Sequence, residues 1–143
     1  MERVVLGLIL LSAGAGDVLA DGAAPRPGLY RIEVRLELPN VLRPMPFRTV
    51  ERCVSQSDGD PGAIVSAPNI EACPLTARSI EGGVLTFERA CPKLNDGRAS
   101  GRFELAEDGF AGRIVLTLGG KNMRLTELQT ATRIGDCPRA PDP

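Results

Sequence analysis

The sequence predicts an all-β fold: an antiparallel meander of about seven strands, curled as a half-barrel or closed as a small barrel, with two disulfides. Three observations support this prediction. Apolar and charged residues alternate with a period of two early in the chain, glycines mark the turns, and no long helical pattern is present. A two-sheet sandwich is the alternative architecture.

The N-terminal residues 1–20 are expected to form a signal peptide that is cleaved after Ala20. Arg3 precedes an apolar run, and compact residues precede the cleavage site. A membrane anchor fits less well, because a spanning helix needs about 20 apolar residues and this run stops at Asp17. Residues 21–27 are expected to be a flexible leader, residues 28–137 a single β domain, and residues 138–143 a disordered tail.

The first strand is the clearest element of the chain. Residues 30–38 read YRIEVRLEL, so one face is apolar and the other is charged. This pattern is typical of a sheet with one side on a core and the other in water. Prolines within residues 39–46 end this strand, and residues 55–71 are expected to form a long loop. A second strand is expected over Phe47–Val54, and its weak alternation leaves open which face it buries.

Four cysteines follow the predicted cleavage site, and in an exported chain they are expected to form two disulfides. A hairpin turn centred on Gly82 places Cys73 opposite Cys91. We therefore predict the bridges Cys73–Cys91 and Cys53–Cys137. The wide spacing of the cysteines disfavours a zinc site. The same register puts four further side chains on the face of the hairpin cysteines: Leu75, Ala77, Leu85 and Phe87.

A second hairpin is predicted by Asp-Gly at 108–109, a dipeptide that favours a two-residue type I′ turn. This turn places Phe103 opposite Ile114. It also places Glu104 opposite Arg113 as a cross-strand ion pair.

The last strand is expected over Asn122–Ile134, with Leu125 opposite Ile114. Beyond Glu127 the alternation moves to the other set of positions, which predicts a β-bulge. The shifted positions are Leu128, Thr130, Thr132 and Ile134.

The composition excludes several classes of function. The chain has no histidine, and this removes the commonest general base and metal ligand. Without residues 1–20 the chain has 16 acidic and 16 basic residues. We therefore expect no nucleic-acid partner, and the charge balance also disfavours an anionic membrane surface as the primary partner. No cofactor, metal site or membrane span is expected in the mature chain.

The order of short motifs resembles the bacterial domain-of-unknown-function family 3617, which consists of small exported proteins. The resemblance covers nearly all of residues 27–137, and Tyr30 stands where the family more often carries Trp. It implies a periplasmic location and a β-rich fold, and it implies no activity. The matching residues are Pro27–Tyr30, Cys53, Cys73, Cys91-Pro92, Gly101, Gly112 and Arg133–Cys137.

The favoured function is a non-enzymatic binding or interaction module for a small apolar ligand or an envelope protein. An apolar ligand would lie on the concave face of a curled sheet, in a pocket of about 300 Å3 or more, whereas a filled interior would make this face simply the core. The candidate apolar face consists of Tyr30, Ile32, Val34, Phe87, Phe103 and Ile114.

Two other functions are less well supported by the sequence. One is an envelope structural or assembly protein, for which no site can be named. The other is a hydrolase that uses a pair of carboxylates. Its candidate residues are Glu51, Glu88 and Asp136, and nothing in the sequence brings two of them together.

Overall fold

The computed structural model describes residues 24–43, 45, 47–55, 64–65, 67–120 and 123–139. The expected signal peptide, residues 21–23 of the leader and residues 140–143 of the tail lie outside these ranges. The prediction of an all-β fold of about seven antiparallel strands is confirmed. The strands are β1 (Gly28–Glu37), β2 (Arg48–Val54), β3 (Leu75–Glu81), β4 (Val84–Cys91), β5 (Gly97–Ala106), β6 (Gly109–Leu118) and β7 (Met123–Gly135).

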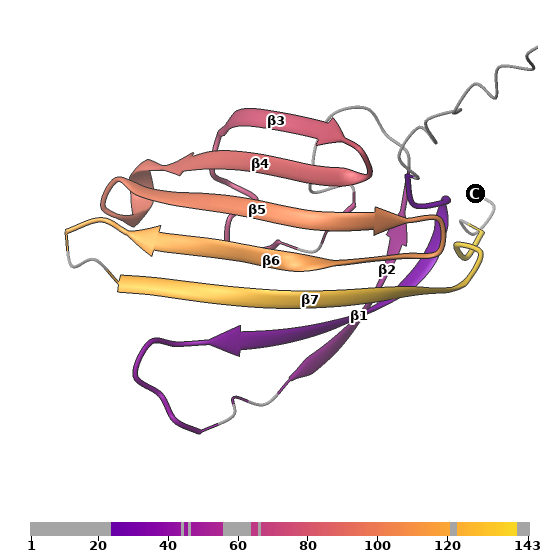
Figure 1. Ribbon diagram of the computed structural model, residues 1–143, viewed down its shortest axis with the longest axis horizontal. Helices are drawn as coiled ribbons and strands as arrows, with labels where there is room; N and C mark the ends of the chain where they lie inside the picture. Colours follow the sequence, from indigo (N-terminus) through magenta and orange to yellow (C-terminus); the bar gives the residue numbers. More distant parts are fainter. Residues whose placement is uncertain are drawn as a thin grey trace, which may run out of the picture.

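The seven strands form one antiparallel sheet in the order β2-β1-β7-β6-β5-β4-β3 (Figure 1). Strands β3 to β7 follow one another as a meander. The hairpin of β1 and β2 then joins the free side of β7. The first and last strands along the chain, β1 and β7, are therefore neighbours in the sheet. Strands β2 and β3 are the two edges, and they do not pair with each other. The architecture is therefore an open curled sheet, neither a closed barrel nor a two-sheet sandwich.

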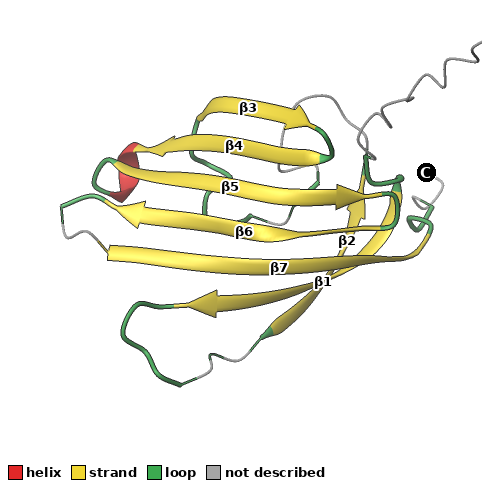
Figure 2. Cartoon of the chain, viewed as in Figure 1, coloured by secondary structure: helices red, strands yellow, loops and turns green. Residues whose placement is uncertain are grey.

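One face of this sheet carries the hydrophobic core. Side chains at alternate positions of β1, β4, β5 and β6 point to this face, as the period-two pattern of β1 predicts. The segment between β2 and β3 covers them, and its Val65 and Ile70 are buried in the same cluster. Figure 2 shows the described parts of this segment behind β4 to β6. We call the core side the inner face and the opposite side the outer face.

Both predicted disulfides are present. Cys73 and Cys91 join the start of the β3–β4 hairpin to the end of β4, with their Cα atoms 4.7 Å apart. Cys53 of β2 bonds Cys137, which follows β7, with Cα atoms 5.5 Å apart. The first bridge is part of the core, whereas the second lies at the surface.

The predicted register of the cysteine hairpin is correct only at its open end. Leu75 pairs with Arg89 as expected, and the register then shifts by one residue before Ala77. The cause is the turn, because Gly82 and Gly83 both have positive φ angles and form a two-residue turn instead of a turn centred on Gly82. As a result Ala77 lies on the outer face and does not join the cysteines in the core. Leu75 keeps its predicted partner but is also exposed, on the edge strand β3.

The predicted register of β5 and β6 is wrong by two residues. The turn residues are Glu107 and Asp108, neither has a positive φ angle, and Phe103 lies opposite Gly112 rather than Ile114. Neighbouring segments fix this turn, since the carbonyl of Glu107 accepts a hydrogen bond of 2.8 Å from the backbone N–H of Arg26. Because the slip is even, every side chain keeps its predicted face.

Two consequences follow for the strands around this turn. The expected pair of Glu104 and Arg113 is absent, because Arg113 lies opposite Arg102. Strand β7 is likewise displaced by two residues, so that Leu125 lies opposite Leu116 and not Ile114.

Strand β7 does carry a register shift beyond Glu127, but only near its end and only against β1, where Leu29 pairs with Gly135 and Tyr30 pairs with Arg133. The alternation does not move to the predicted positions at Glu127. The pairing of β6 with β7 runs without a shift from Gly109 to Leu118. The inward-pointing positions of β7 instead continue through Glu127 and Gln129, two polar side chains that are buried. The amide of Gln129 donates a hydrogen bond of 2.6 Å to Oε1 of Glu127, and this bond lowers the cost of burying both groups.

Candidate functional site on the outer face of the sheet

The candidate apolar face is the core of the protein. Its six side chains are all buried, with exposed fractions between 0 and 5%. The rings of Phe87 and Phe103 stack with centroids 6.4 Å apart, and that of Phe110 lies edge-on to Phe103 at 5.9 Å. A hollow of about 20 Å3 lies between Ile70 of the covering segment and Ile114 and Leu116 of this face. A ligand of drug size needs about 300 Å3 or more, so this cavity is far too small for one.

The outer face carries two shallow depressions over β3 to β6, each of about 430 Å3. They adjoin each other, because Glu88, Ser100 and Val115 line both. Their walls combine apolar and polar atoms and include exposed arginine side chains. Both of these depressions lie on the side of the sheet that faces away from the core.

The strand register gathers these arginines into one half of the outer face. Arg102 lies directly opposite Arg113, and Arg113 leads through Leu128 to Arg35 of β1. A second row, nearer the ends of β6 and β1, holds Arg98 and Arg124 on either side of Thr117. We call this set the basic patch: Arg35, Arg98, Arg102, Arg113 and Arg124.

The neighbouring row of the outer face has the opposite charge. It crosses the whole sheet through Glu81, Glu104 and Glu33, with no cation between them. The charge balance of the whole chain therefore conceals a separation of charge along the strands. Within the basic half, Glu88 and Glu37 are the acidic residues of the intervening row.

The arginines of the basic patch are exposed, and within the described residues none of them forms an ion pair within 4.0 Å. Arg102 and Arg113 are like charges at directly paired positions, an arrangement that destabilises a sheet. A protein gains nothing for its own stability from this arrangement. Such a patch is instead suited to an anionic partner, whose oxygens guanidinium groups bind well.

The three candidate carboxylates are not brought together. Glu51 lies on the edge strand β2 and pairs with Arg31 at 3.1 Å, whereas Glu88 lies on the outer face of β4. Asp136 follows β7, is 93% exposed and pairs with Arg133. The buried carboxylate is one that sequence reasoning missed: Glu127, whose Oε2 lies 4.0 Å from Arg48. No group of three or more potential metal ligands occurs among the residues described.

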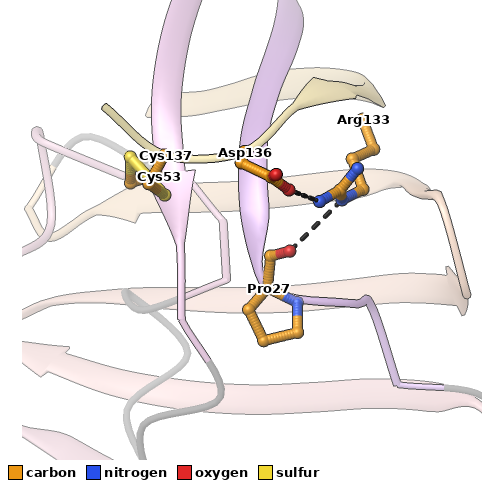
Figure 3. The surroundings of a disulfide bond; sticks show 5 residues. All are labelled: Pro27, Cys53, Arg133, Asp136 and Cys137. Carbon is orange, nitrogen blue, oxygen red and sulfur yellow. Dashed lines mark hydrogen bonds and ion pairs between the residues drawn. A yellow bond between two sulfur atoms is a disulfide. The ribbon is translucent and has the colours of Figure 1, made fainter. Parts of the chain in front are cut away.

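The opposite end of the sheet is held together by hydrogen bonds and ion pairs. The Tyr30 hydroxyl donates to the carbonyl of Arg26 at 2.7 Å, and Arg26 in turn pairs with Asp108 at 2.9 Å. Burial raises the pKa of the Tyr30 phenol, and the Asp108 carboxylate adds to this rise. In Figure 3 the Arg133 side chain reaches both Asp136 and the carbonyl of Pro27, beside the Cys53–Cys137 bridge. We call this region, formed by residues 25–31, 107–108 and 132–137, the clasped end.

The structure thus defines a class of protein: a disulfide-linked, open antiparallel sheet with a hydrophobic core on one face. The chain belongs to the family described as "Protein of unknown function (DUF3617)", whose model matches residues 25–137. Comparison with curated proteins gave no match, and neither did comparison with solved structures. Within the described residues, no helix is long and apolar enough to cross a membrane. Several motifs that suggested the family, including Pro27–Tyr30 and Arg133–Cys137, lie in the clasped end and have a structural role there.

Proposed function

We propose that this protein is a periplasmic, non-enzymatic interaction module that contacts an envelope partner through the outer face of its sheet. The observation that carries the proposal is the contrast between the two faces. The inner face carries the buried hydrophobic cluster, whereas the outer face carries two adjoining hollows of about 430 Å3 each.

Export to the periplasm is supported by the signal-peptide pattern of residues 1–20 and by the two disulfides. A non-enzymatic role is supported by the separation of the exposed carboxylates and by the absence of histidine. The unpaired arginines beside the hollows support a contact surface rather than a site for chemistry.

Photo-cross-linking in intact cells tests this proposal. A photoreactive residue at Ser100, which lines both hollows, is expected to give a covalent adduct. The matched control is Thr132, which is exposed on the same face at the clasped end and should give none. Equal labelling at both positions, or none at Ser100, would contradict a contact over the hollows.

Native mass spectrometry of protein from the periplasm, with its disulfides intact, tests the interior. The expected mass is that of a chain beginning at Asp21 with two disulfides and no retained small molecule. A stoichiometric lipid-sized adduct would support the carriage of an apolar ligand instead. A defined oligomer would support the role in envelope assembly.

A further inference from the structure

The loop after β1 exposes four large apolar side chains close together in sequence. Leu42 is fully exposed, Phe47 is 61% exposed, Val41 is 44% exposed and Leu38 is 37% exposed. Elsewhere in the described chain, exposed large apolar side chains are single residues on β3 and β7: Leu75, Ile80, Met123 and Ile134. A cluster of this kind at a loop tip is typical of a surface that meets an apolar environment.

This loop lies at the basic end of the sheet. Phe47 shares a hollow of about 220 Å3 on the outer face with Arg35 and Leu128, and Glu33 of the acidic row lines its other side. Arg35 and Leu128 belong to the same cross-sheet row as Arg113 and Arg102. Exposed apolar side chains and unpaired arginines therefore adjoin each other, and the clasped end lies at the other end of the strands (Figure 1).

We propose that the envelope partner is an anionic phospholipid surface, on which the protein docks peripherally. Val41, Leu42 and Phe47 would enter the headgroup region, and the basic patch would bind lipid phosphates. Apolar insertion combined with basic residues around it is how peripheral proteins bind anionic membranes. A soluble acidic polymer would use the arginines, but it would leave Leu42 and Phe47 in water. This inference rests on the proposed contact through the outer face.

Flotation of the disulfide-bonded mature protein with lipid vesicles tests the inference. The protein should float with vesicles of equal parts phosphatidylcholine and phosphatidylglycerol. It should remain unbound with phosphatidylcholine alone. Added salt should release it, because screening weakens the contacts between arginine and phosphate. Absence of binding to the mixed vesicles at low salt would overturn the inference.

Two pairs of variants locate the contact. Leu42→Ser with Phe47→Ser, and Arg102→Gln with Arg113→Gln, should each weaken vesicle binding by about tenfold or more. All four side chains are exposed, so the fold should be kept, and circular dichroism checks this. The matched controls are Ile80→Ser, an exposed apolar residue on β3, and Arg31→Gln, an exposed arginine at the clasped end. Each control should change binding by less than about twofold.

Two outcomes would overturn the lipid inference. In the first, the Leu42→Ser and Phe47→Ser variant binds vesicles as tightly as the unmodified protein. In the second, the protein binds polyphosphate through Arg102 and Arg113 but does not bind the mixed vesicles, which would identify a soluble polyanion as the partner. Neither outcome affects the proposed contact through the outer face, which depends on the cross-linking at Ser100.

Discussion

The two ends of the sheet differ in how their charged groups are satisfied. At the clasped end, Arg26 and Arg133 each bond a carboxylate and the Cys53–Cys137 bridge lies beside them. At the basic end, Arg102 and Arg113 lie side by side without an ion pair among the described residues. The clasped end therefore stabilises the fold, whereas the basic end leaves charge available for a partner.

The largest effect should come from removing the Cys53–Cys137 bridge at the clasped end. The bridge closes a sequence separation of 84 residues. Chain entropy then predicts a loss of about 4–5 kcal/mol when both cysteines are replaced by serine. Urea unfolding of this variant measures the loss. Replacing Cys73 and Cys91, which are 18 residues apart, should cost less, about 3 kcal/mol. A larger loss of stability in the Cys73 and Cys91 variant would show that loop length does not determine how much each disulfide stabilises the fold.

A substitution that overpacks the middle of the sheet, Gly112→Ala, should cause the next largest loss of stability. A Cβ atom on Gly112 would lie 2.6 Å from the Cα atom of Phe103, so Gly112→Ala must push two paired strands apart. We expect a loss of about 2–3 kcal/mol in urea unfolding. Gly135→Ala is the control, because a Cβ atom there would meet no atom within 4 Å beyond its chain neighbours. Equal stabilities of the two variants would contradict the close fit of Phe103 on Gly112.

The phenol of Tyr30 should make the clasped end sensitive to alkali. Tyr30→Phe removes hydrogen bonds to the carbonyls of Arg26 and Glu107, and it should cost about 1 kcal/mol at neutral pH. Because the folded-state pKa is raised above the ordinary value of 10.0, the stability linked to this proton is complete below pH 10 and declines as the pH rises further. Unfolding measured across this range should show a smaller decline for Tyr30→Phe. An equal decline in both proteins would mean that another group is responsible.

The smallest effect should have the opposite sign. Arg102→Gln removes one of two like charges that lie directly opposite each other, so it should raise stability by a few tenths of a kcal/mol. The same change at Arg133 should lower stability, since this side chain bonds Pro27 and Asp136. Thermal unfolding at low salt compares the two variants. A loss of stability in Arg102→Gln would mean that the basic patch supports the fold.

The parts of the fold that sequence reasoning predicted correctly are those fixed by local pattern. Alternation in β1 identified its buried face, and the facing cysteines identified both bridges. The registers of β5 to β7 were wrong, because the turn at Glu107 and Asp108 is set by bonds from Arg26 and Arg133, which are distant in sequence. Even slips preserve the faces of a sheet, so the buried faces of β5 and β6 were predicted despite these errors, whereas those of β3 and of β7 beyond Glu127 were not.

The same register errors prevented the candidate site on the outer face from being predicted. The predicted register pairs Arg113 with Glu104 as a neutral ion pair. In that register Arg113 does not lie beside Arg102, and no basic patch is predicted. Net charge could not show it either, because the arginines and glutamates separate into rows only when the sheet forms. The sequence feature that could have indicated the basic patch is the presence of arginines at exposed positions of three neighbouring strands: 98, 102, 113 and 124.

The pairing of β1 with β7 also orders events during synthesis. A ribosome releases β1 and β2 first, and together they form only a two-stranded hairpin, which is marginally stable in water by itself. Their partner strand, Met123–Gly135, is the last to emerge. The nascent chain therefore cannot complete its sheet until β7 has emerged, whereas the four strands of the β3–β6 meander can pair before then.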